Sequence, residues 1–304
     1  MKFGTTVWTY QWHPPYDDAL RRIAGLGFRA VELIAWNREA LDTYYTPATI
    51  KSLRSLLADE GVELSEFVST PEGMASPDAK ERDQAVEHFK RLAEVAVELG
   101  TTLVNSVAPY PLNLRFPPIT QKHLAQEWTI DFPPGLDWRQ NWADYVESLR
   151  RCCAICEDAG LRYALEPHPY RWMRNAASMM RLIDQVGSPA LGMNFDPSHL
   201  FPMGEMVEMV VYEVGDRIFH THFSDNDGTS NAHWRPGKGK INWQGVLQAL
   251  HAVGYDNVLS IELEDVPGVA RHNQESTSAL DREVTLSRHY LTELCEEVGI
   301  RLEG

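Results

Sequence analysis

The chain has 304 residues, of which 43% are hydrophobic and 23% charged, a composition that is typical of globular enzymes and excludes wholesale disorder. Its formal net charge of -15 repels polyanions, so we expect no nucleic-acid partner. No apolar run approaches the roughly 18 residues of a membrane span, and the N-terminus lacks the apolar core of a secretory signal. We therefore expect a cytoplasmic protein with no membrane partner. Three of the four cysteines lie within one predicted helix, which argues against a disulfide framework.

Strand-like and amphipathic helical segments alternate along the whole chain. The predicted strands are residues 3–10, 30–34, 63–68, 102–107, 162–166, 191–196, 218–223 and 258–262. The predicted helices are residues 16–26, 47–60, 79–99, 142–159, 176–186, 205–212, 243–253 and 280–298. Glycines follow several of these helices, where a left-handed cap is needed: Gly27, Gly61, Gly100, Gly160, Gly187, Gly254 and Gly299.

This repeated order predicts an α/β fold, a (β/α)8 TIM barrel, in a single domain that spans residues 1–304. A doubly wound sheet is the alternative, but no glycine-rich phosphate turn follows the first strand. A long segment rich in proline and aromatic residues, 108–141, follows the fourth predicted strand. Loops of this length are usually functional. The segment can form a lid or an aromatic shelf beside the mouth of the barrel, or it can pack on a partner subunit.

Four acidic or imidazole side chains end successive strands in the second half of the chain: Glu166, Asp196, His222 and Glu262. Their separations of roughly 30, 26 and 40 residues are those of successive βα units, so the four side chains can converge on the C-terminal mouth of a barrel. Carboxylates with a single imidazole form a site for a divalent cation. Oxygen-rich ligation favours Mn²⁺ or Mg²⁺, with Co²⁺, Zn²⁺ or Fe²⁺ also possible.

Strand periodicity places the neighbours of these residues. Alternate side chains of a strand share one face, so His220 and His222 point into the barrel. Three residues of the same strand are expected to face the helices: Phe219, Thr221 and Phe223. The same alternation places small or polar side chains beneath the candidate ligands: Gly192, Asn194 and Ser260. Bulky apolar side chains would be expected if these were ordinary core positions.

This constellation can move a proton next to a carbonyl. A divalent cation between Glu166 and Glu262 would chelate a carbonyl and a neighbouring hydroxyl of a sugar and stabilise a developing enediolate. One carboxylate can then take the adjacent proton and another can return it, which gives epimerisation or isomerisation. The candidate substrate contacts are polar or aromatic side chains: His199, Arg235, His168, Trp8 and Trp172. A structural role is the alternative for His168.

The motifs around these residues resemble those of the xylose-isomerase-like TIM-barrel superfamily of sugar phosphate isomerases and epimerases. The resemblance is carried by Leu-Glu-Pro-His at 165–168, Asn-Phe-Asp-Pro-Ser-His-Leu at 194–200 and Ile-Phe-His-Thr-His-Phe-Ser-Asp at 218–225. This superfamily also includes inosose dehydratase and endonuclease repair enzymes of the AP endonuclease family 2 type. The resemblance implies that Glu166, Asp196, His222 and Glu262 are metal ligands. It also implies that Glu166 and Glu262 act as the acid/base pair, and that His199 and Arg235 contact the substrate.

One departure from the family pattern concerns the substrate. The ketohexose epimerases of the superfamily carry a further acidic residue six positions after the first ligand, where this chain has Trp172. The runner-up function is therefore a lyase that performs β-elimination on a 3-keto-glycoside, as in the similar barrel subunits of C-glycoside deglycosidases, or an inosose-type dehydratase. A repair endonuclease would need a multi-metal cluster and a basic groove. We expect a sugar, keto-sugar or glycoside as substrate and a homo-oligomer, with an accessory subunit as a further option.

Overall fold

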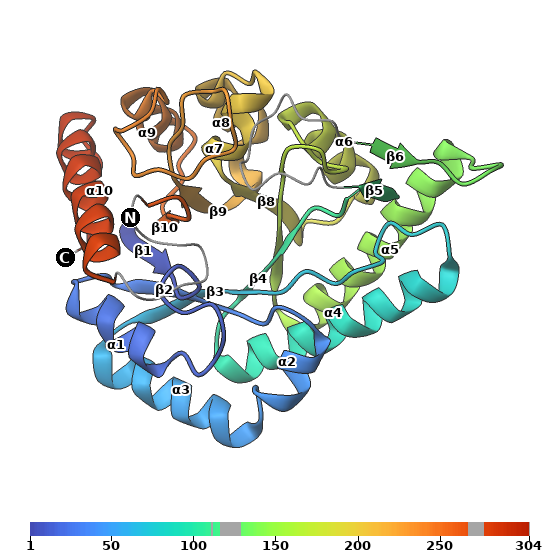
Figure 1. Ribbon diagram of the computed structural model, residues 1–304, viewed down its shortest axis with the longest axis horizontal. Helices are drawn as coiled ribbons and strands as arrows, with labels where there is room; N and C mark the ends of the chain where they lie inside the picture. The colour runs from blue at the N-terminus through green and yellow to red at the C-terminus, as the bar shows by residue number, and fades with distance from the viewer. Residues whose placement is uncertain (111, 116–128, 267–276, 304) are drawn as a thin grey trace.

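The computed structural model describes residues 1–110, 112–115, 129–266 and 277–303. Parallel strands close into an eight-stranded barrel in the order β1-β10-β9-β8-β7-β4-β3-β2, with helices around it (Figure 1). The prediction of a (β/α)8 TIM barrel is confirmed, and the doubly wound sheet is excluded because the sheet is closed. The barrel strands are β1 Lys2–Thr6, β2 Ala30–Ile34, β3 Glu63–Val68, β4 Leu103–Val107, β7 Arg162–Glu166, β8 Leu191–Phe195, β9 Ile218–Phe223 and β10 Val258–Ile261.

The α-helices of the described residues lie outside the barrel, and their apolar faces pack against the strands. They are α1 Asp17–Gly25, α2 Arg38–Thr43, α3 Pro47–Glu60, α4 Ala79–Leu99, α5 Trp138–Ala159, α6 Ala176–Val186, α7 Pro197–Leu200, α8 Val207–Val214, α9 Trp243–Ala252 and α10 Thr277–Glu297. Two short 3-10 helices, η1 Phe201–Met203 and η2 Gly215–Arg217, flank α8. All seven glycines that were predicted to cap helices have positive φ, for example 93° at Gly100 and 68° at Gly160, which a side chain would strain.

The main corrections to the predicted elements are two boundaries and one missed helix. The first strand ends at Thr6 instead of residue 10, because the backbone carbonyl of Val7 accepts from the amides of Tyr10 and Gln11 and so forms a turn. The helix predicted to begin at 142 begins at Trp138, where Asp137 caps it. Helix α2 was not predicted, because six residues are too few to show a helical period.

A bulge in β9 changes the direction of one predicted side chain. Strand β9 carries one extra residue relative to β8, so the alternation of its side chains is interrupted. Phe219 was expected to face the helices, but it packs with Leu103 and Ala164. Ala164 lies on the same strand face as Glu166, and therefore inside the barrel. A Cβ atom at Gly192 would lie 2.5 Å from the Phe219 ring, so this glycine leaves the space that the ring fills.

The long segment after β4 contains a short antiparallel pair of strands, β5 Asn113–Arg115 and β6 Thr129–Asp131. Further along it, the ring of Trp138 stacks on that of Trp172 at 4.4 Å. Residues 111 and 116–128 of the segment lie outside the described residues. The lid or aromatic shelf therefore stays a prediction.

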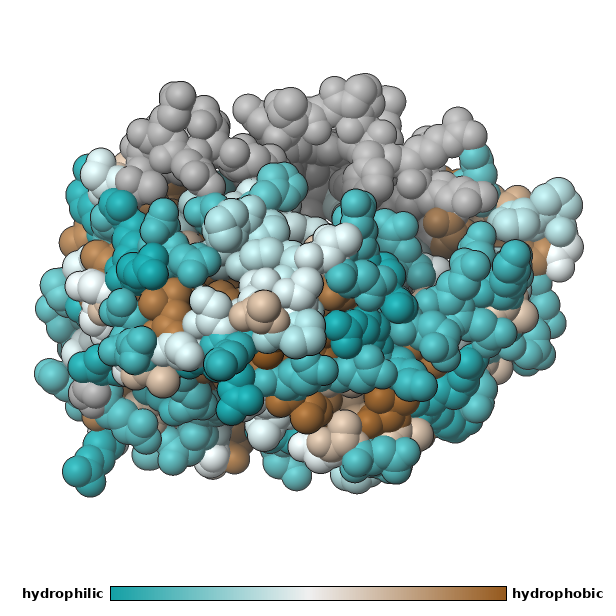
Figure 2. All heavy atoms as spheres, turned by 90° about the horizontal axis from the view of Figure 1, so that it is seen from below, coloured by the Kyte–Doolittle hydropathy of each residue, from teal (hydrophilic) through white to brown (hydrophobic). Residues whose placement is uncertain are grey.

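The face of the molecule seen in Figure 2 is mainly polar. Figure 2 shows a face of the molecule on which hydrophobic residues form scattered patches among hydrophilic ones. Among the described helices, none combines the length and the apolar character that crossing a membrane requires.

Candidate metal and acid/base site

The four predicted strand-end residues come together at one end of the barrel. Glu166 is the last residue of β7 and His222 lies near the end of β9. Asp196 and Glu262 directly follow β8 and β10. One ligand atom from each residue lies within 4.8 Å of the others, and all four residues are buried. The barrel thus gathers residues that are far apart in sequence into a cluster that can hold a metal ion.

His222 occupies the middle of this cluster. Its Nδ1 atom lies 2.8 Å from Oε1 of Glu166 and 3.3 Å from Oε2 of Glu262. The side-chain amide of Asn194, from β8, lies 3.1 Å from the same nitrogen. The cluster therefore presents carboxylate oxygens and one imidazole nitrogen to a common point, a donor set suited to a divalent cation.

Asp196 has one oxygen held by the protein and one directed into the cluster. Its Oδ1 atom accepts hydrogen bonds of 2.7 Å from the backbone amide and from the hydroxyl of Ser198, and so caps α7. Its Oδ2 atom is buried and accepts no hydrogen bond from the described residues. Burial alone would raise the pKa of Asp196, but the nearby imidazoles of His199 and His233 and the Ser198 hydroxyl lower it to about 2. An ionised oxygen that faces the imidazoles of His199 and His233 at 3.4 Å and 3.6 Å is therefore available as a ligand.

The charges of the cluster also favour a cation. Among the described residues, the ion pairs of the three carboxylates are all with histidines. Burial is the largest effect on Glu166 and raises the pKa of that carboxyl, and the neighbouring acids Glu262 and Asp196 add to the rise. A divalent ion would offset this crowding of negative charge in a buried site, because it favours the ionised carboxylates. The residues therefore fit a divalent metal.

Glu262 is oriented by a tryptophan from the turn after β1. The indole Nε1 of Trp8 donates a hydrogen bond of 2.8 Å to Oε1 of Glu262. The Trp8 ring also lies edge-on to His222, with ring centres 5.9 Å apart. The other oxygen of Glu262 is thereby turned toward His222 and the centre of the cluster. Trp8 was predicted as a substrate contact, and the structure places it beside a candidate acid/base residue.

Two further predicted residues border the cluster. His168 has Nε2 at 3.3 Å from Oε2 of Glu166. His199, in α7, has Nε2 at 3.4 Å from Oδ2 of Asp196, and its Nδ1 pairs with Oδ1 of Asn231 at 2.7 Å. The two imidazole rings lie 3.4 Å apart. Both histidines therefore stand where a substrate held by the cluster would meet them, and these roles stay predictions.

Two predicted substrate contacts have other partners. Nε of Arg235 lies 3.2 Å from a carboxylate oxygen of Glu283 in α10. Trp172 is buried, with its ring stacked on Trp138 and close to that of Trp142. Neither residue belongs to the clusters of possible metal-binding side chains in the described part of the chain. Their proposed contacts with a substrate stay predictions.

Three buried residues of the site were not found from the sequence. Glu32 in β2 and Glu66 in β3 lie below His222, with carboxylate oxygens 2.8 Å and 3.5 Å from its Nε2 atom. His233, after β9, lies 3.6 Å from Asp196. Glu32 and Glu66 stand inside strand segments that read as ordinary buried strands. For Glu32, a carboxylate in an otherwise apolar strand is the signal that would have revealed it, because buried charges need partners.

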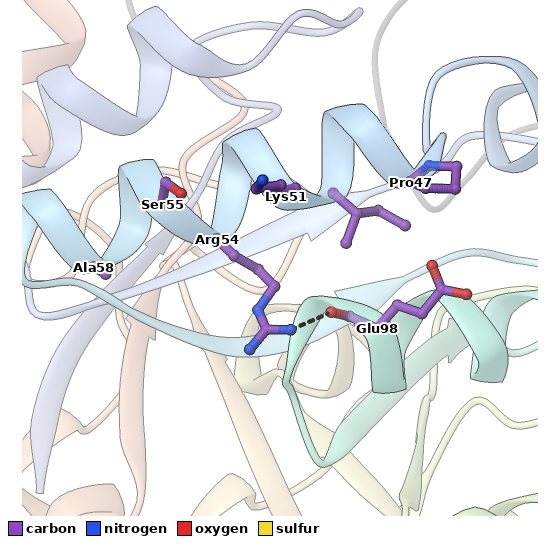
Figure 3. A pocket seen from close by; sticks show the side chains of 7 residues that line it. Pro47, Lys51, Arg54, Ser55, Ala58 and Glu98 are labelled. Atoms are coloured by element: carbon purple, nitrogen blue, oxygen red, sulfur yellow. Dashed lines mark hydrogen bonds between the residues drawn. The ribbon is translucent and has the colours of Figure 1, made fainter.

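The groove between α3 and α4 offers no comparable chemistry. It encloses about 510 Å³ and is lined by residues of these two helices, including Arg54, Lys51 and Glu98 (Figure 3). The guanidinium of Arg54 donates a hydrogen bond of 3.2 Å to the backbone carbonyl of Glu98. One carboxylate and no imidazole line the described part of this groove. The cluster in the barrel is therefore the better candidate for catalysis.

Residues 20–282 match the family of xylose isomerase-like TIM barrels. The chain belongs to this family. Among its relatives is the fructoselysine 3-epimerase of Escherichia coli O157:H7, which is 24% identical over 260 residues that span 82% of this chain and 86% of that enzyme. Further relatives include D-psicose 3-epimerases and inosose isomerases, so the chain has distant homology to sugar epimerases and isomerases.

Solved structures of similar fold include two sugar epimerases. The D-psicose 3-epimerase of Clostridium cellulolyticum H10, determined with D-tagatose, superposes with a TM-score of 0.75 at 21% identity, covering 97% of this chain and 99% of that one. The 3-keto-D-glucoside 4-epimerase of Escherichia coli, in its apo form, gives a TM-score of 0.74 at 16% identity, covering 95% and 99%. At these identities the likeness shows the shared fold.

Proposed function

We propose that this chain is a divalent-metal-dependent sugar epimerase or isomerase that removes and returns a proton next to a carbonyl. The observation that carries the proposal is the cluster of Glu166, Asp196, His222 and Glu262 at the end of the barrel. Its donor set fits Mn²⁺ best, with Mg²⁺, Co²⁺, Zn²⁺ and Fe²⁺ as alternatives. The distant homology to sugar epimerases and isomerases supports the same reaction class.

The two glutamates are arranged to act in sequence. When bound, a divalent cation would polarise the substrate carbonyl and so acidify the neighbouring C–H bond. Glu262 and Glu166 come from β10 and β7, which are separated in the barrel by β9 and β8. A sugar carbon held between them can lose its proton to one carboxylate and regain a proton from the other. Return to the opposite face of the same carbon gives an epimer, and return to the neighbouring carbon gives an isomer.

Other side chains hold this arrangement in place. The Trp8 indole fixes one oxygen of Glu262, which leaves the other oxygen to accept a proton. His199 donates from Nδ1 to Oδ1 of Asn231, so Nε2 of the neutral ring faces the cluster and can accept a hydrogen bond from a substrate hydroxyl. His168, beside Glu166, is placed for a second such contact. These neighbours reduce the motion of the reacting groups, which favours proton transfer.

A lyase that eliminates the aglycone of a 3-keto-glycoside is the second candidate. It begins with the same proton removal, and differs because the electron pair then expels a leaving group from the adjacent carbon. The observation that favours it is Trp172, which is closed into an aromatic stack with Trp138 and Trp142. A carboxylate at this position could bind the hydroxyls of a free keto-sugar, and the buried indole offers no such acceptor.

The test is proton NMR of the Mn²⁺-loaded enzyme in D₂O with a panel of keto-sugars and 3-keto-glycosides. Exchange of the acidic proton with sugar conversion supports the epimerase or isomerase, and release of the aglycone favours the lyase. Glu262→Gln should abolish exchange while retaining the fold. Glu63→Gln is a matched control, because Glu63 lies at the opposite, N-terminal end of β3 and is exposed. Full exchange activity in Glu262→Gln would remove the acid/base assignment.

A further inference from the structure

Glu32 lies at the centre of a buried polar network below the candidate metal cluster. It is the middle residue of β2, and its side chain has no exposure to solvent. Its Oε2 atom lies 2.8 Å from Nε2 of His222. Its Oε1 atom lies 3.0 Å from Nε2 of His220 and accepts a hydrogen bond from the hydroxyl of Ser260. Both oxygens are therefore engaged, and neither is free to turn toward another partner.

The two nitrogens of His222 face different groups. Nδ1 faces Glu166 and Glu262, whereas Nε2 faces Glu32. An imidazole that binds a metal through one nitrogen carries its proton on the other, and a carboxylate can only accept that proton in a hydrogen bond. When a metal takes the lone pair of Nδ1, the carboxylate opposite Nε2 therefore accepts the remaining N–H and holds the ring with Nδ1 directed at the cluster.

We propose that Glu32 is the positioning residue of this site: it fixes the ring orientation and tautomer of His222 so that Nδ1 can bind the metal. The inference rests on the proposed function, because it assigns His222 as a ligand. It adds a residue from β2, a strand that contributes none of the four candidate ligands. His220 and Ser260 act on His222 indirectly, because they hold the other oxygen of Glu32.

The alternative is that the lower network is itself a second metal site. Single atoms of Glu32, Glu66, His220 and His222 lie within 4.8 Å of one another. However, both oxygens of Glu32 are already in hydrogen bonds, and one oxygen of Glu66 accepts 2.9 Å from the amide of Asn105. The network therefore has the hydrogen bonds expected of a support beneath a ligand. The number of ions bound per chain separates the two possibilities.

The first experiment is titration calorimetry of metal-free wild type and Glu32→Gln with Mn²⁺. Loss of an outer partner of a metal-binding histidine typically weakens metal affinity about 10- to 100-fold, and we expect a loss of this size in Glu32→Gln. Wild type should bind one ion per chain. Glu32→Asp should recover part of the affinity because it restores a carboxylate, whereas the Gln amide can turn a donor toward Nε2. Tyr45→Phe is the control, since it removes another buried hydrogen bond at β2, to the carbonyl of Ile34.

A spectroscopic measurement separates positioning from general support of the fold. The ¹⁵N signals of His222 in the Mg²⁺-saturated protein should show a proton on Nε2 in wild type, and this state should be lost or mixed in Glu32→Gln. If Glu32→Gln does not fold, Ser260→Ala removes one anchor of Glu32 with little change in volume, and should weaken Mn²⁺ binding several-fold.

Three outcomes would overturn the inference: unchanged Mn²⁺ affinity and an unchanged His222 tautomer in the variants, two tightly bound ions per wild-type chain, or no binding of divalent metal. If wild type binds one ion but exchanges no sugar proton, only the proposed function fails. The binding and NMR measurements require no turnover, so the two failures are distinguishable.

Discussion

Replacing Asp196 by Asn should separate the structural role of this side chain from metal binding. The Asn oxygen can still accept the two 2.7 Å hydrogen bonds from Ser198, so the cap of α7 is kept. The second oxygen, which accepts no hydrogen bond within the described structure, becomes an amide nitrogen that cannot bind a cation. The variant should therefore fold like wild type without metal, but lose most of its affinity for metal.

The magnitude follows from linkage between binding and unfolding. Free Mn²⁺ at 100 times the wild-type Kd adds about 2.7 kcal/mol to the free energy of unfolding. For 304 residues the unfolding entropy is roughly 0.6 kcal/mol per kelvin, so Tm should rise by about 4 °C. Loss of an outer partner of a ligand weakens metal affinity by up to about 100-fold, and loss of a ligand should weaken it at least as much. With affinity weakened about 100-fold, the same Mn²⁺ concentration adds only about 0.4 kcal/mol to the free energy of unfolding, and Tm rises by less than about 1 °C.

Differential scanning calorimetry with and without Mn²⁺ measures both proteins. Asp196→Ala is the matched variant, because it also removes the helix cap and should lower metal-free stability by a further ~1 kcal/mol. An equal Mn²⁺-dependent rise of Tm in wild type and Asp196→Asn would refute the assignment of Asp196 as a ligand. A large loss of metal-free stability in Asp196→Asn would instead show that the lost carboxylate charge supports the fold.

Three other predictions concern residues around the site and in the core. Trp8→Phe should lower the rate of proton exchange roughly 10- to 100-fold, because a hydrogen bond to the charged Glu262 is lost, and an unchanged rate would show that this bond is not needed. Burial lowers the pKa of His88, which lies 3.0 Å from Ser69, from 6.5 to about 4. The folded state therefore resists protonation of His88, so the stability that this group contributes above about pH 6.5 is lost as the pH falls toward 4. In urea unfolding, the free energy of unfolding should fall less over this pH range in His88→Gln than in wild type. Trp172→Ala should cost about 3 to 5 kcal/mol in urea unfolding because the ring is buried in a stack, and a cost below 1 kcal/mol would contradict tight packing there.

The barrel could be predicted because its signals are local and repeated. The longer helices, the glycine caps and the barrel strands can each be predicted from a few residues. The closed order of the strands then follows from the known handedness of βα units. The convergence of Glu166, Asp196, His222 and Glu262 is a consequence of that topology, since the C-terminal ends of all strands meet at one mouth. Their convergence could therefore be predicted although the four residues are far apart in sequence.

One error arises where a contact depends on a residue on a neighbouring strand. The bulge in β9 reverses Phe219, and its only sequence counterpart is the absence of a side chain at Gly192 on the neighbouring strand. Neither position is unusual alone. Alternation along a strand predicts faces only while the pairing register is regular, so a single extra residue is enough to make such a prediction wrong.

Glu32 shows the same limit at the site itself. Within Ala-Val-Glu-Leu-Ile it stands at the position where an apolar strand would carry another buried residue. Two of its partners, His220 and His222, follow it by about 190 positions. A buried carboxylate is costly without partners, so its presence in this strand already requires donors on facing strands. The residues that end the strands define which groups meet at the mouth, whereas the residues one layer below decide how those groups are turned. In this barrel, we infer that the lower layer fixes the ring orientation of His222. It thereby sets the direction of Nδ1, the one nitrogen that the four candidate ligands contribute.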